Sequence, residues 1–140
     1  MECLEEANQH FQVIVFTASH QTYADAILDY LDPNHELIQY RMYRQHCILT
    51  KEGYYVKDLR VIGNRDLKDL VIVDNSVYSF AFQIDNGIPI IPFYKDPNDE
   101  EMLHLIYYLN CLANVEDVRV QNRAAFELYK LSNGDQESEA

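Results

Sequence analysis

The chain has 140 residues, of which 48% are hydrophobic, and it carries a formal net charge of −12 at pH 7. This length and composition predict one globular domain with a sizeable core, over residues 1–131, followed by an acidic, disordered tail over residues 132–140. The negative charge excludes a nucleic-acid partner, because no basic stripe is present to neutralise phosphates. No apolar run approaches the length that spans a bilayer, so no membrane segment is visible.

The first half of the chain predicts two strands, each preceded by a helix. Residues 2–10 form a short acidic helix and residues 11–17 an apolar strand. A second helix runs over residues 21–31, where Pro33 stops it, and a second strand covers residues 36–43. The helix stripe predicted to face the core consists of Tyr23, Ala24, Ile27, Leu28 and Leu31.

The second half continues the alternation of strands and helices. Two short apolar runs flank Lys51–Gly53 and predict a β-hairpin, and residues 70–73 form a strand buried on both faces. A short helix over residues 77–84 leads to residues 88–93, whose two prolines restrict them to the edge of a sheet. Two more helices follow, over residues 96–113 and 118–131, the first with Met102 inward and the second with Val120 and Ala124 inward. The alternation of strands and helices defines an α/β protein.

Polar side chains follow the buried strand directly, at Asp74–Asn75–Ser76. In open α/β sheets, ligands bind in the crevice beyond the carboxyl ends of parallel strands, where a carboxylate can hold a hard cation. The same three residue types are also good N-caps, so capping of the next helix is the alternative interpretation.

Two further segments supply groups that could meet Asp74. Thr17 ends the first strand, and Lys57 lies in the apolar stretch Tyr55–Leu59. A hydroxyl, an ammonium and a carboxylate from separate segments can together hold a phosphoryl group, with Arg41 and Arg44 as further candidate cations. The alternatives are that Thr17 merely ends its strand and that Lys57 forms a salt bridge with Asp58 or Asp74.

Cysteine usage sets the expected compartment. Cys3, Cys47 and Cys111 are odd in number and widely spaced, and no metal-binding pattern connects them. We therefore expect reduced, mostly buried thiols in a nuclear or cytoplasmic protein.

Several blocks in order resemble the FCP/SCP-type phosphatases of the haloacid dehalogenase superfamily, which act on phosphoserine and phosphothreonine in protein tails. The blocks are Phe16–Ser19 with Tyr23–Asp25, then Tyr43–Cys47, Tyr55–Leu59 and Val73–Ser76. The resemblance implies a haloacid-dehalogenase-like (Rossmann-like) three-layer sandwich, with a mostly parallel sheet and a small β-hairpin insertion.

The resemblance also implies a role for each site residue. Thr17 and Lys57 would contact the phosphate, and Asp74 would hold Mg²⁺ with help from Asn75. Tyr23 and Arg44 would face the phosphorylated peptide, with surface packing as the alternative for both residues. The partner implied is a phosphorylated protein tail or peptide, and the oligomeric state stays open.

One family feature is missing from the sequence. Members carry an Asp-x-Asp block on their first strand, where the first Asp is the nucleophile and the second is the general acid/base, but this chain contains no Asp-x-Asp. We therefore expect a truncated phosphatase domain that lacks its first, nucleophile-bearing strand, is inactive as given, and binds Mg²⁺ weakly or not at all. The alternatives are a non-catalytic phosphopeptide- or protein-binding module, a relative of the mitochondrial import receptor with the same domain, and an incomplete gene model or fragment.

Overall fold

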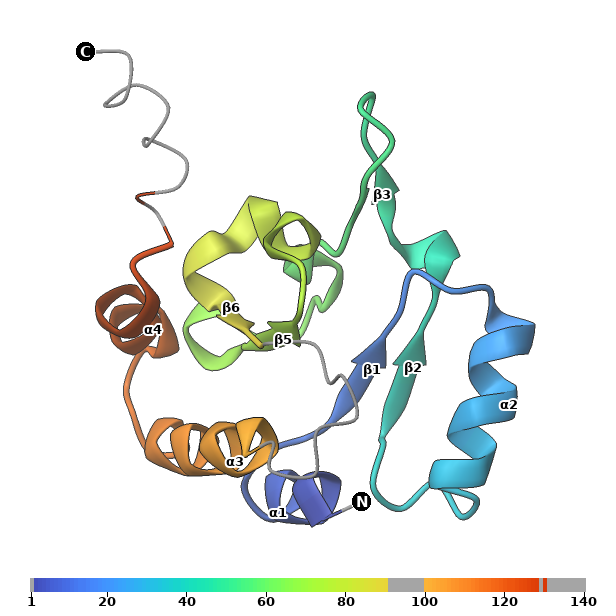
Figure 1. The fold of residues 1–140 in the computed structure, drawn as a ribbon, viewed down its shortest axis with the longest axis horizontal. Coiled ribbons are helices and arrows are strands. Elements are labelled where there is room, and N and C mark those ends of the chain that lie inside the picture. Colours follow the sequence, from blue (N-terminus) through green and yellow to red (C-terminus); the bar gives the residue numbers. More distant parts are fainter. Residues whose placement is uncertain (1, 91–99, 129, 131–140) are drawn as a thin grey trace.

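A computed structural model describes residues 2–90, 100–128 and 130 of the chain. Short strands alternate with helices, as the sequence predicts (Figure 1). The α-helices and strands are α1 (Glu2–His10), β1 (Ile14–Phe16), α2 (Gln21–Leu31), β2 (Tyr40–Met42), β3 (Ile48–Leu49), β4 (Tyr55–Val56), β5 (Ile72–Asp74), β6 (Gly87–Pro89), α3 (Glu101–Leu112) and α4 (Val118–Phe126). The 3₁₀ helices are η1 (Arg44–His46), η2 (Leu59–Val61), η3 (Leu67–Asp69) and η4 (Val77–Asn86).

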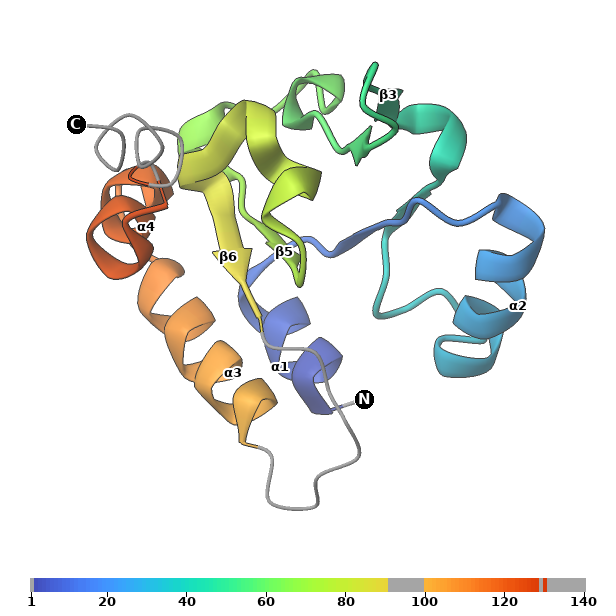
Figure 2. The same ribbon diagram turned by 45° about the horizontal axis from the view of Figure 1, so that its top comes forward.

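The described strands form three two-stranded sheets. β1 pairs with β2 and β5 pairs with β6, both in parallel, whereas β3 and β4 form the predicted antiparallel hairpin. In Figures 1 and 2, β5 and β1 lie between β6 and β2. This α/β arrangement with parallel strands is compatible with a haloacid-dehalogenase-like fold, and the complete three-layer sandwich with a missing first strand stays a prediction.

The β1–β2 pair is covered by α2, which has the predicted bounds. Ala24 and Leu28 on α2 form a buried cluster with Ile38 and Tyr43. The predicted inward stripe is too wide, however, because Tyr23 is 66% exposed and Ile27 44% exposed. An 11-residue helix packed against one two-stranded sheet buries a narrow stripe only.

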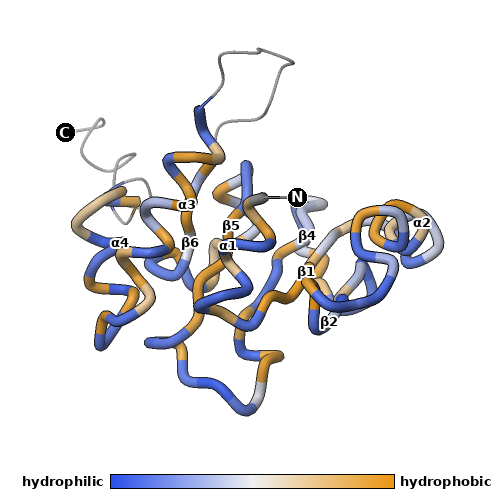
Figure 3. Tube along the Cα trace, turned by 90° about the horizontal axis from the view of Figure 1, so that it is seen from below, coloured by the Kyte–Doolittle hydropathy of each residue, from blue (hydrophilic) through white to orange (hydrophobic). Residues whose placement is uncertain are grey.

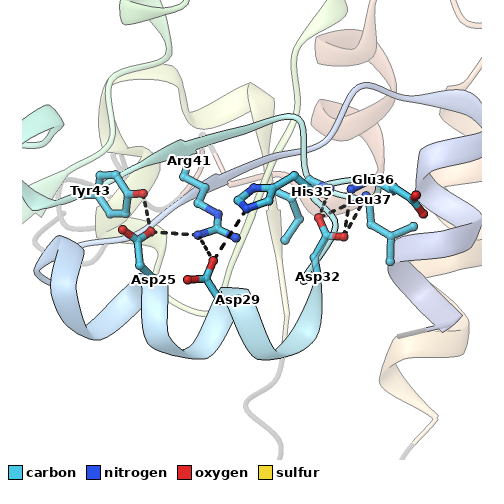
Figure 4. Close-up of polar contacts among 9 residues, drawn as sticks. Asp25, Asp29, Asp32, His35, Glu36, Leu37, Arg41 and Tyr43 are labelled. Atoms are coloured by element: carbon cyan, nitrogen blue, oxygen red, sulfur yellow. Dashed lines mark hydrogen bonds and ion pairs between the residues drawn. The ribbon is translucent and has the colours of Figure 1, made fainter.

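Carboxylates fix the loop and the strand that follow α2 (Figure 4). Asp32 is 3% exposed and accepts hydrogen bonds from the N–H groups of Glu36, Leu37 and Ile38, which turn the chain after α2. Burial acts to raise the pKa of Asp32, but these three N–H groups outweigh it and the pKa is lowered. The loop therefore depends on one ionised side chain.

Arg41 belongs to the same region and not to the predicted phosphate site. Its Nη1 lies 3.0 Å from Asp25 and 2.8 Å from Asp29, both on α2 (Figure 4). The Tyr43 hydroxyl also donates to Asp25, at 2.6 Å. The prediction that Arg41 is a phosphate-binding cation is therefore wrong, because two helix carboxylates bind it.

The β5–β6 pair packs under η4 through a second buried cluster, made of Leu59, Ile72 and Phe80. The segment from Val77 onward is a kinked 3₁₀ helix and not the regular helix that the sequence predicts. Gln83 lies at the kink, where its backbone is not helical. Its side chain accepts a hydrogen bond from the N–H of Leu59 and donates one to Asp58.

The third cluster joins β6 to α3 and α4 and includes Leu105, Leu109, Leu112 and Val118. α1 lies beside α3 in Figures 1 and 2 and packs its Cys3 and Ala7 against this cluster. The predicted start of α3 lies partly outside the described residues.

Three predicted inward positions on these two helices are wrong. Met102 is 46% exposed, Val120 is 63% exposed, and Ala124 is also exposed. α4 turns Asn122 and Phe126 inward instead and ends at Phe126, where Glu127 adopts a left-handed backbone with φ 52°. The predicted extension of this helix to Leu131 is therefore wrong, and the acidic tail lies outside the described residues.

The cysteines are less buried than expected. All three are unpaired thiols; Cys111 is exposed, and Cys3 and Cys47 are half-buried. Among the described helices, none combines the length and hydropathy that a bilayer crossing requires.

Candidate functional site

An ion pair between Lys57 and Asp74 forms the centre of the candidate site. The Lys57 Nζ lies 2.5 Å from Oδ2 of Asp74, and the two side chains are 11% and 10% exposed. The backbone N–H of Lys57 donates to the Ser79 carbonyl at 2.7 Å, which connects the end of the hairpin to η4. The alternative interpretation of Lys57, a salt bridge with Asp58 or Asp74, is therefore confirmed for Asp74. The same contact brings together two of the three predicted phosphate-site residues, whose role in phosphate binding stays a prediction.

Asp74 ends β5 and also shapes the turn after it. Its Oδ1 accepts the N–H of Ser76 at 2.9 Å, while Oδ2 faces Lys57. Ser76 precedes η4 but makes no side-chain cap. The three polar residues therefore do not cap η4 as the alternative interpretation proposed, and Asp74 directs one oxygen into the turn and the other to the lysine.

Thr17 directly follows β1. Its Oγ1 accepts the N–H of Ser19 at 3.0 Å, and its own N–H donates to Met42 at 2.9 Å, which continues the β1–β2 ladder. As an acceptor from Ser19, the Thr17 hydroxyl still has its own proton to donate.

Cys47 lies beside the end of β1. Its thiol lies 3.9 Å from the Thr17 carbonyl. Burial raises the pKa of Cys47; the charges of Lys57 and Arg44 act to lower it and that of Asp74 to raise it. A single side chain is therefore in contact with Thr17 and within electrostatic reach of both members of the ion pair.

Arg44 also lies at this end of β1. Its Nε donates to the Ala18 carbonyl at 2.6 Å, and its guanidinium carbon lies 4.9 Å from the centre of the Tyr55 ring. These contacts hold the guanidinium beside the site, whereas Tyr23 and Asn75 are exposed.

The donor set at Asp74 does not fit Mg²⁺ on its own. Magnesium prefers octahedral oxygen coordination with one or two carboxylates. Asp74 is one carboxylate, and Lys57 binds one of its oxygens. No group of three or more potential ligands (His, Cys, Asp or Glu) with metal-binding geometry occurs in the part of the chain that the structure describes.

Two residues that lie close to the candidate site residues, Cys47 and Gln83, are not predicted from the sequence. Cys47 was treated only as a reduced thiol, although it lies in the same block as Arg44, which is the signal that could have identified it. Gln83 had no signal at all, because its bonds to Asp58 and Leu59 depend on the kink in η4.

The chain is an α/β domain in which Thr17 follows the parallel strand β1 and Asp74, paired with Lys57, ends the parallel strand β5. The family model described as NLI interacting factor-like phosphatase matches residues 1–119. The chain belongs to this family of phosphatases, which confirms the resemblance to FCP/SCP-type enzymes.

Similar proteins come from distant organisms. The chain is 51% identical over 130 residues to CTD small phosphatase-like protein 2 of Dictyostelium discoideum, an alignment that covers 93% of this chain and 22% of the relative. It is 44% identical over 119 residues to CTD small phosphatase-like protein 3 of Caenorhabditis elegans, covering 84% of this chain and 41% of the relative. It is 42% identical over 116 residues to CTD nuclear envelope phosphatase 1 of Xenopus tropicalis, covering 83% of this chain and 47% of the relative. The chain thus spans less than half the length of each of these relatives.

Proposed function

We propose that this chain contains the phosphate-binding part of a phosphoserine and phosphothreonine protein phosphatase domain. The observation that supports the proposal is the Lys57–Asp74 pair, which is nine-tenths buried at the carboxyl end of β5. A buried ammonium is costly unless it has a functional or structural partner, and here its carboxylate partner lies at the ligand-binding end of a parallel strand. In this proposal the polar end of β1, with Thr17 and Arg44, completes the site beside the pair.

Each group has a distinct task in this proposal. Lys57 has three N–H donors and directs one to Asp74, so two can bind phosphoryl oxygens. The Thr17 hydroxyl donates to another oxygen and Arg44 binds the peptide near the phosphate, with exposed Tyr23 against a neighbouring side chain. Because Lys57 and Asp74 neutralise each other, Arg44 would supply the positive charge that an acidic substrate requires against the overall charge of −12.

We further propose that the chain alone does not turn over substrate. In a phosphatase of this type, a carboxylate oxygen attacks phosphorus and the bond to the serine or threonine oxygen breaks. A second carboxyl group protonates that oxygen, and water then hydrolyses the aspartyl-phosphate. The 140 residues contain no Asp-x-Asp to supply the two carboxyl groups. With one carboxylate at Asp74, Mg²⁺ binding by this chain is expected to be weak or absent.

The test is a titration with a phosphoserine peptide, read by isothermal calorimetry. Lys57→Met removes the charge but keeps the length of the side chain, and Lys51→Met, in the exposed hairpin turn, is the matched control. Because a hydrogen bond to a charged group contributes about 1.5–3 kcal/mol, we expect Lys57→Met to weaken binding roughly tenfold or more. Lys51→Met should leave it unchanged.

Equal affinity in the two variants would contradict a phosphate site at Lys57. Incubation with Mg²⁺ and an aryl phosphate tests the second half of the proposal, and no release above the blank is expected. Clear release by the wild type would show that a nucleophile is present and overlooked. Phosphopeptide binding that depends on Lys57 without any release would favour the non-catalytic binding module.

For the compartment and the substrate, the names of the relatives provide the support. They include a nuclear envelope phosphatase and, in Schizosaccharomyces pombe, a nuclear envelope morphology protein that is 41% identical. We propose a nuclear-associated role on a phosphorylated protein tail. Immunofluorescence against a nuclear envelope marker would check the location.

A further inference from the structure

Arg44 is held at its backbone and at its side chain by the segment between β1 and α2. Its backbone N–H donates to the Ser19 carbonyl at 3.1 Å, and its Nε donates to the Ala18 carbonyl at 2.6 Å. Its Nη1 lies 2.9 Å from Nε2 of His20. Figure 3 shows hydrophobic residues along β1, and the polar contacts to Arg44 begin after that strand, at Ala18. Among these contacts, His20 provides the side-chain partner.

The contact between the two side chains fixes the protonation of the imidazole. An arginine side chain carries N–H donors and no acceptor, and it stays charged at physiological pH. Nε2 of His20 must therefore accept the hydrogen bond, which requires the neutral imidazole with its proton on Nδ1. A protonated imidazole would bring a second donor and a second positive charge to the same short distance, so the contact is lost when His20 takes up a proton.

The His20 side chain is not used to cap α2. His20 is the N-cap residue of this helix, with φ −67° and ψ 148°, and its carbonyl accepts the N–H of Ala24 at 3.0 Å. Its side chain makes no capping hydrogen bond, and histidine is not among the residues that usually provide one. The imidazole instead reaches η1, the 3₁₀ helix that begins at Arg44. A substitution of His20 therefore acts on Arg44 without removing a side-chain cap of α2.

Charged and titratable groups on neighbouring elements surround this contact. The guanidinium carbon of Arg44 lies 4.9 Å from the centre of the Tyr55 ring on β4, which holds one face of the guanidinium. Cys47, which directly follows η1, lies within electrostatic reach of Arg44 and Lys57. Within the described residues, the charged group that contacts the His20 ring is Arg44, so protonation of the ring acts on Arg44 first.

The contacts of Arg44 leave part of its guanidinium open to a ligand. The Nε–H binds the Ala18 carbonyl and one Nη1–H binds His20, which leaves the second Nη1–H and both Nη2–H groups. Neighbouring guanidinium donors bind a phosphate or a carboxylate in a bidentate manner. With two nitrogens fixed and one face against Tyr55, the planar group presents these donors in one orientation, so a ligand meets them preorganised.

We propose that neutral His20 is a positioning residue, which orients the Arg44 guanidinium for the binding of a phosphorylated peptide. The inference rests on the proposed role of Arg44 in peptide binding and adds the group that fixes its direction. Because Nε2 accepts a hydrogen bond only in the neutral ring, protonation of His20 weakens phosphopeptide binding. The added positive charge would by itself strengthen it. The sign of the pH effect therefore separates positioning from general electrostatic attraction.

The first test uses a fluorescein-labelled phosphoserine peptide, titrated at pH 8 by fluorescence anisotropy. His20→Ala removes the acceptor, and His20→Gln replaces it with an amide oxygen that does not titrate. The control is His104→Gln, at an exposed position on α3, which lies apart from α2 in Figures 1 and 3. We expect His20→Ala to bind about three- to tenfold more weakly than the wild type, and the two Gln variants within about twofold of it. Wild-type affinity in His20→Ala would overturn the proposal.

The second readout is the same titration at intervals from pH 8 to pH 5, the range in which histidine side chains take up a proton. The phosphate also takes up a proton there, but it does so with every variant, so the ratio of wild-type to His20→Gln affinity isolates His20. We expect this ratio to fall about three- to tenfold on acidification. A constant ratio would show that protonation of His20 has no role, a rising ratio would show charge attraction, and either would overturn the proposal.

NMR of the ligand-free chain separates a failure of this inference from a failure of the proposed function. Long-range ¹H–¹⁵N spectra at pH 8 should show His20 with its proton on Nδ1. The Arg44 Nε–H resonance should move in His20→Ala and return toward its wild-type position in His20→Gln. The other tautomer, or an unchanged Arg44 resonance in His20→Ala, would overturn the inference whether or not the peptide binds.

The peptide titrations distinguish the same two failures. Loss of binding in Lys57→Met together with wild-type affinity in His20→Ala would overturn this inference and leave the proposed function intact. Absence of phosphopeptide binding by the wild type would overturn the proposed function, and with it the role of His20 in orienting Arg44 for a peptide.

Discussion

The two parallel strand pairs use their charged side chains in opposite ways. Around β1–β2, Arg41 is bound by two carboxylates and Asp32 by three backbone N–H groups, so each ion stabilises the fold. At the end of β5, Lys57 and Asp74 face each other, and their ion pair leaves two ammonium donors for a ligand.

The difference teaches which ions to assign to function. A carboxylate that holds backbone N–H groups has its oxygens committed, and its removal breaks the fold locally. An ion pair at the carboxyl end of a parallel strand keeps hydrogen-bonding capacity at the place where ligands bind. By this criterion Asp32 is structural and Lys57 is the candidate for anion binding. Arg41 is assigned to the fold by its two helix carboxylates, although its Nε and Nη2 lack a partner in the described part of the chain.

A substitution in the core beside the β5–β6 pair should lower the free energy of unfolding the most. Phe80, on η4, is fully buried, and its ring is so close to Gly87 that no larger residue fits there without movement. We expect Phe80→Ala to lower the free energy of unfolding by about 3–5 kcal/mol, measured by urea denaturation. Phe82→Ala, at a 48% exposed position, is the control, and equal losses in the two variants would contradict the described core.

A substitution at Asp32, which holds the loop before β2, should lower the free energy of unfolding by less. Asp32→Ala leaves three backbone donors without their carboxylate, and we expect a loss of about 1–3 kcal/mol in the free energy of unfolding. Asp29→Ala is the matched control, because Asp29 is 59% exposed and its pair with Arg41 should contribute about 1 kcal/mol at most. A neutral Asp32→Ala would show that the loop does not depend on this side chain.

The stability of the protein should depend on pH through the carboxyl group of Asp58. Hydrogen bonds from Arg60 are the main cause that lowers the pKa of Asp58 from its usual 3.8 to about 2. Because the pKa is lowered in the folded state, the stabilisation is present above the unfolded value and is lost as the pH falls toward the folded value. Chemical denaturation at intervals from pH 5 to pH 2 should show this loss in the wild type and less of it in Asp58→Asn.

The exposed Asp66 provides the control for this series. Asp66→Asn should retain the wild-type loss of stability on acidification. If Asp58→Asn and Asp66→Asn follow the same curve, Asp58 is not the carboxylate responsible.

The smallest effect is expected where the hairpin touches η4. The rings of Tyr54 and Tyr78 stack with centres 4.7 Å apart, although both residues are about half exposed. Tyr78→Ala should lower the free energy of unfolding by about 0.5–1 kcal/mol, and Tyr54→Phe, which keeps the ring, should have almost no effect. Thermal unfolding of both variants would measure this, and a large loss in Tyr54→Phe would indicate a role for its hydroxyl.

The sequence predicted the order of elements well, because capping and turn residues act locally. Pro33 and Gly53 correctly mark the end of α2 and the hairpin turn, where Gly53 has φ 89°. Predictions that required tertiary contacts were less accurate. Val120 was predicted inward and is exposed, because the face of α4 that packs against the core is set by Asn122 and Phe126.

Predictions of the candidate site also succeeded where the local sequence was sufficient and failed where tertiary contacts decided. The residue blocks identified Lys57 and Asp74, and the structure brings them together. The sequence could not assign Arg41 correctly, because its two carboxylate partners lie on a helix that precedes it by more than ten residues.

The most direct test is a two-dimensional ¹H–¹⁵N NMR titration of the chain with phosphoserine. A phosphate held jointly by Thr17, Lys57 and the turn after Asp74 should shift the amides of Ser19, Lys57 and Ser76 together, with one shared dissociation constant. Shifts confined to one strand end, or different constants for the two ends, would contradict a common phosphate site.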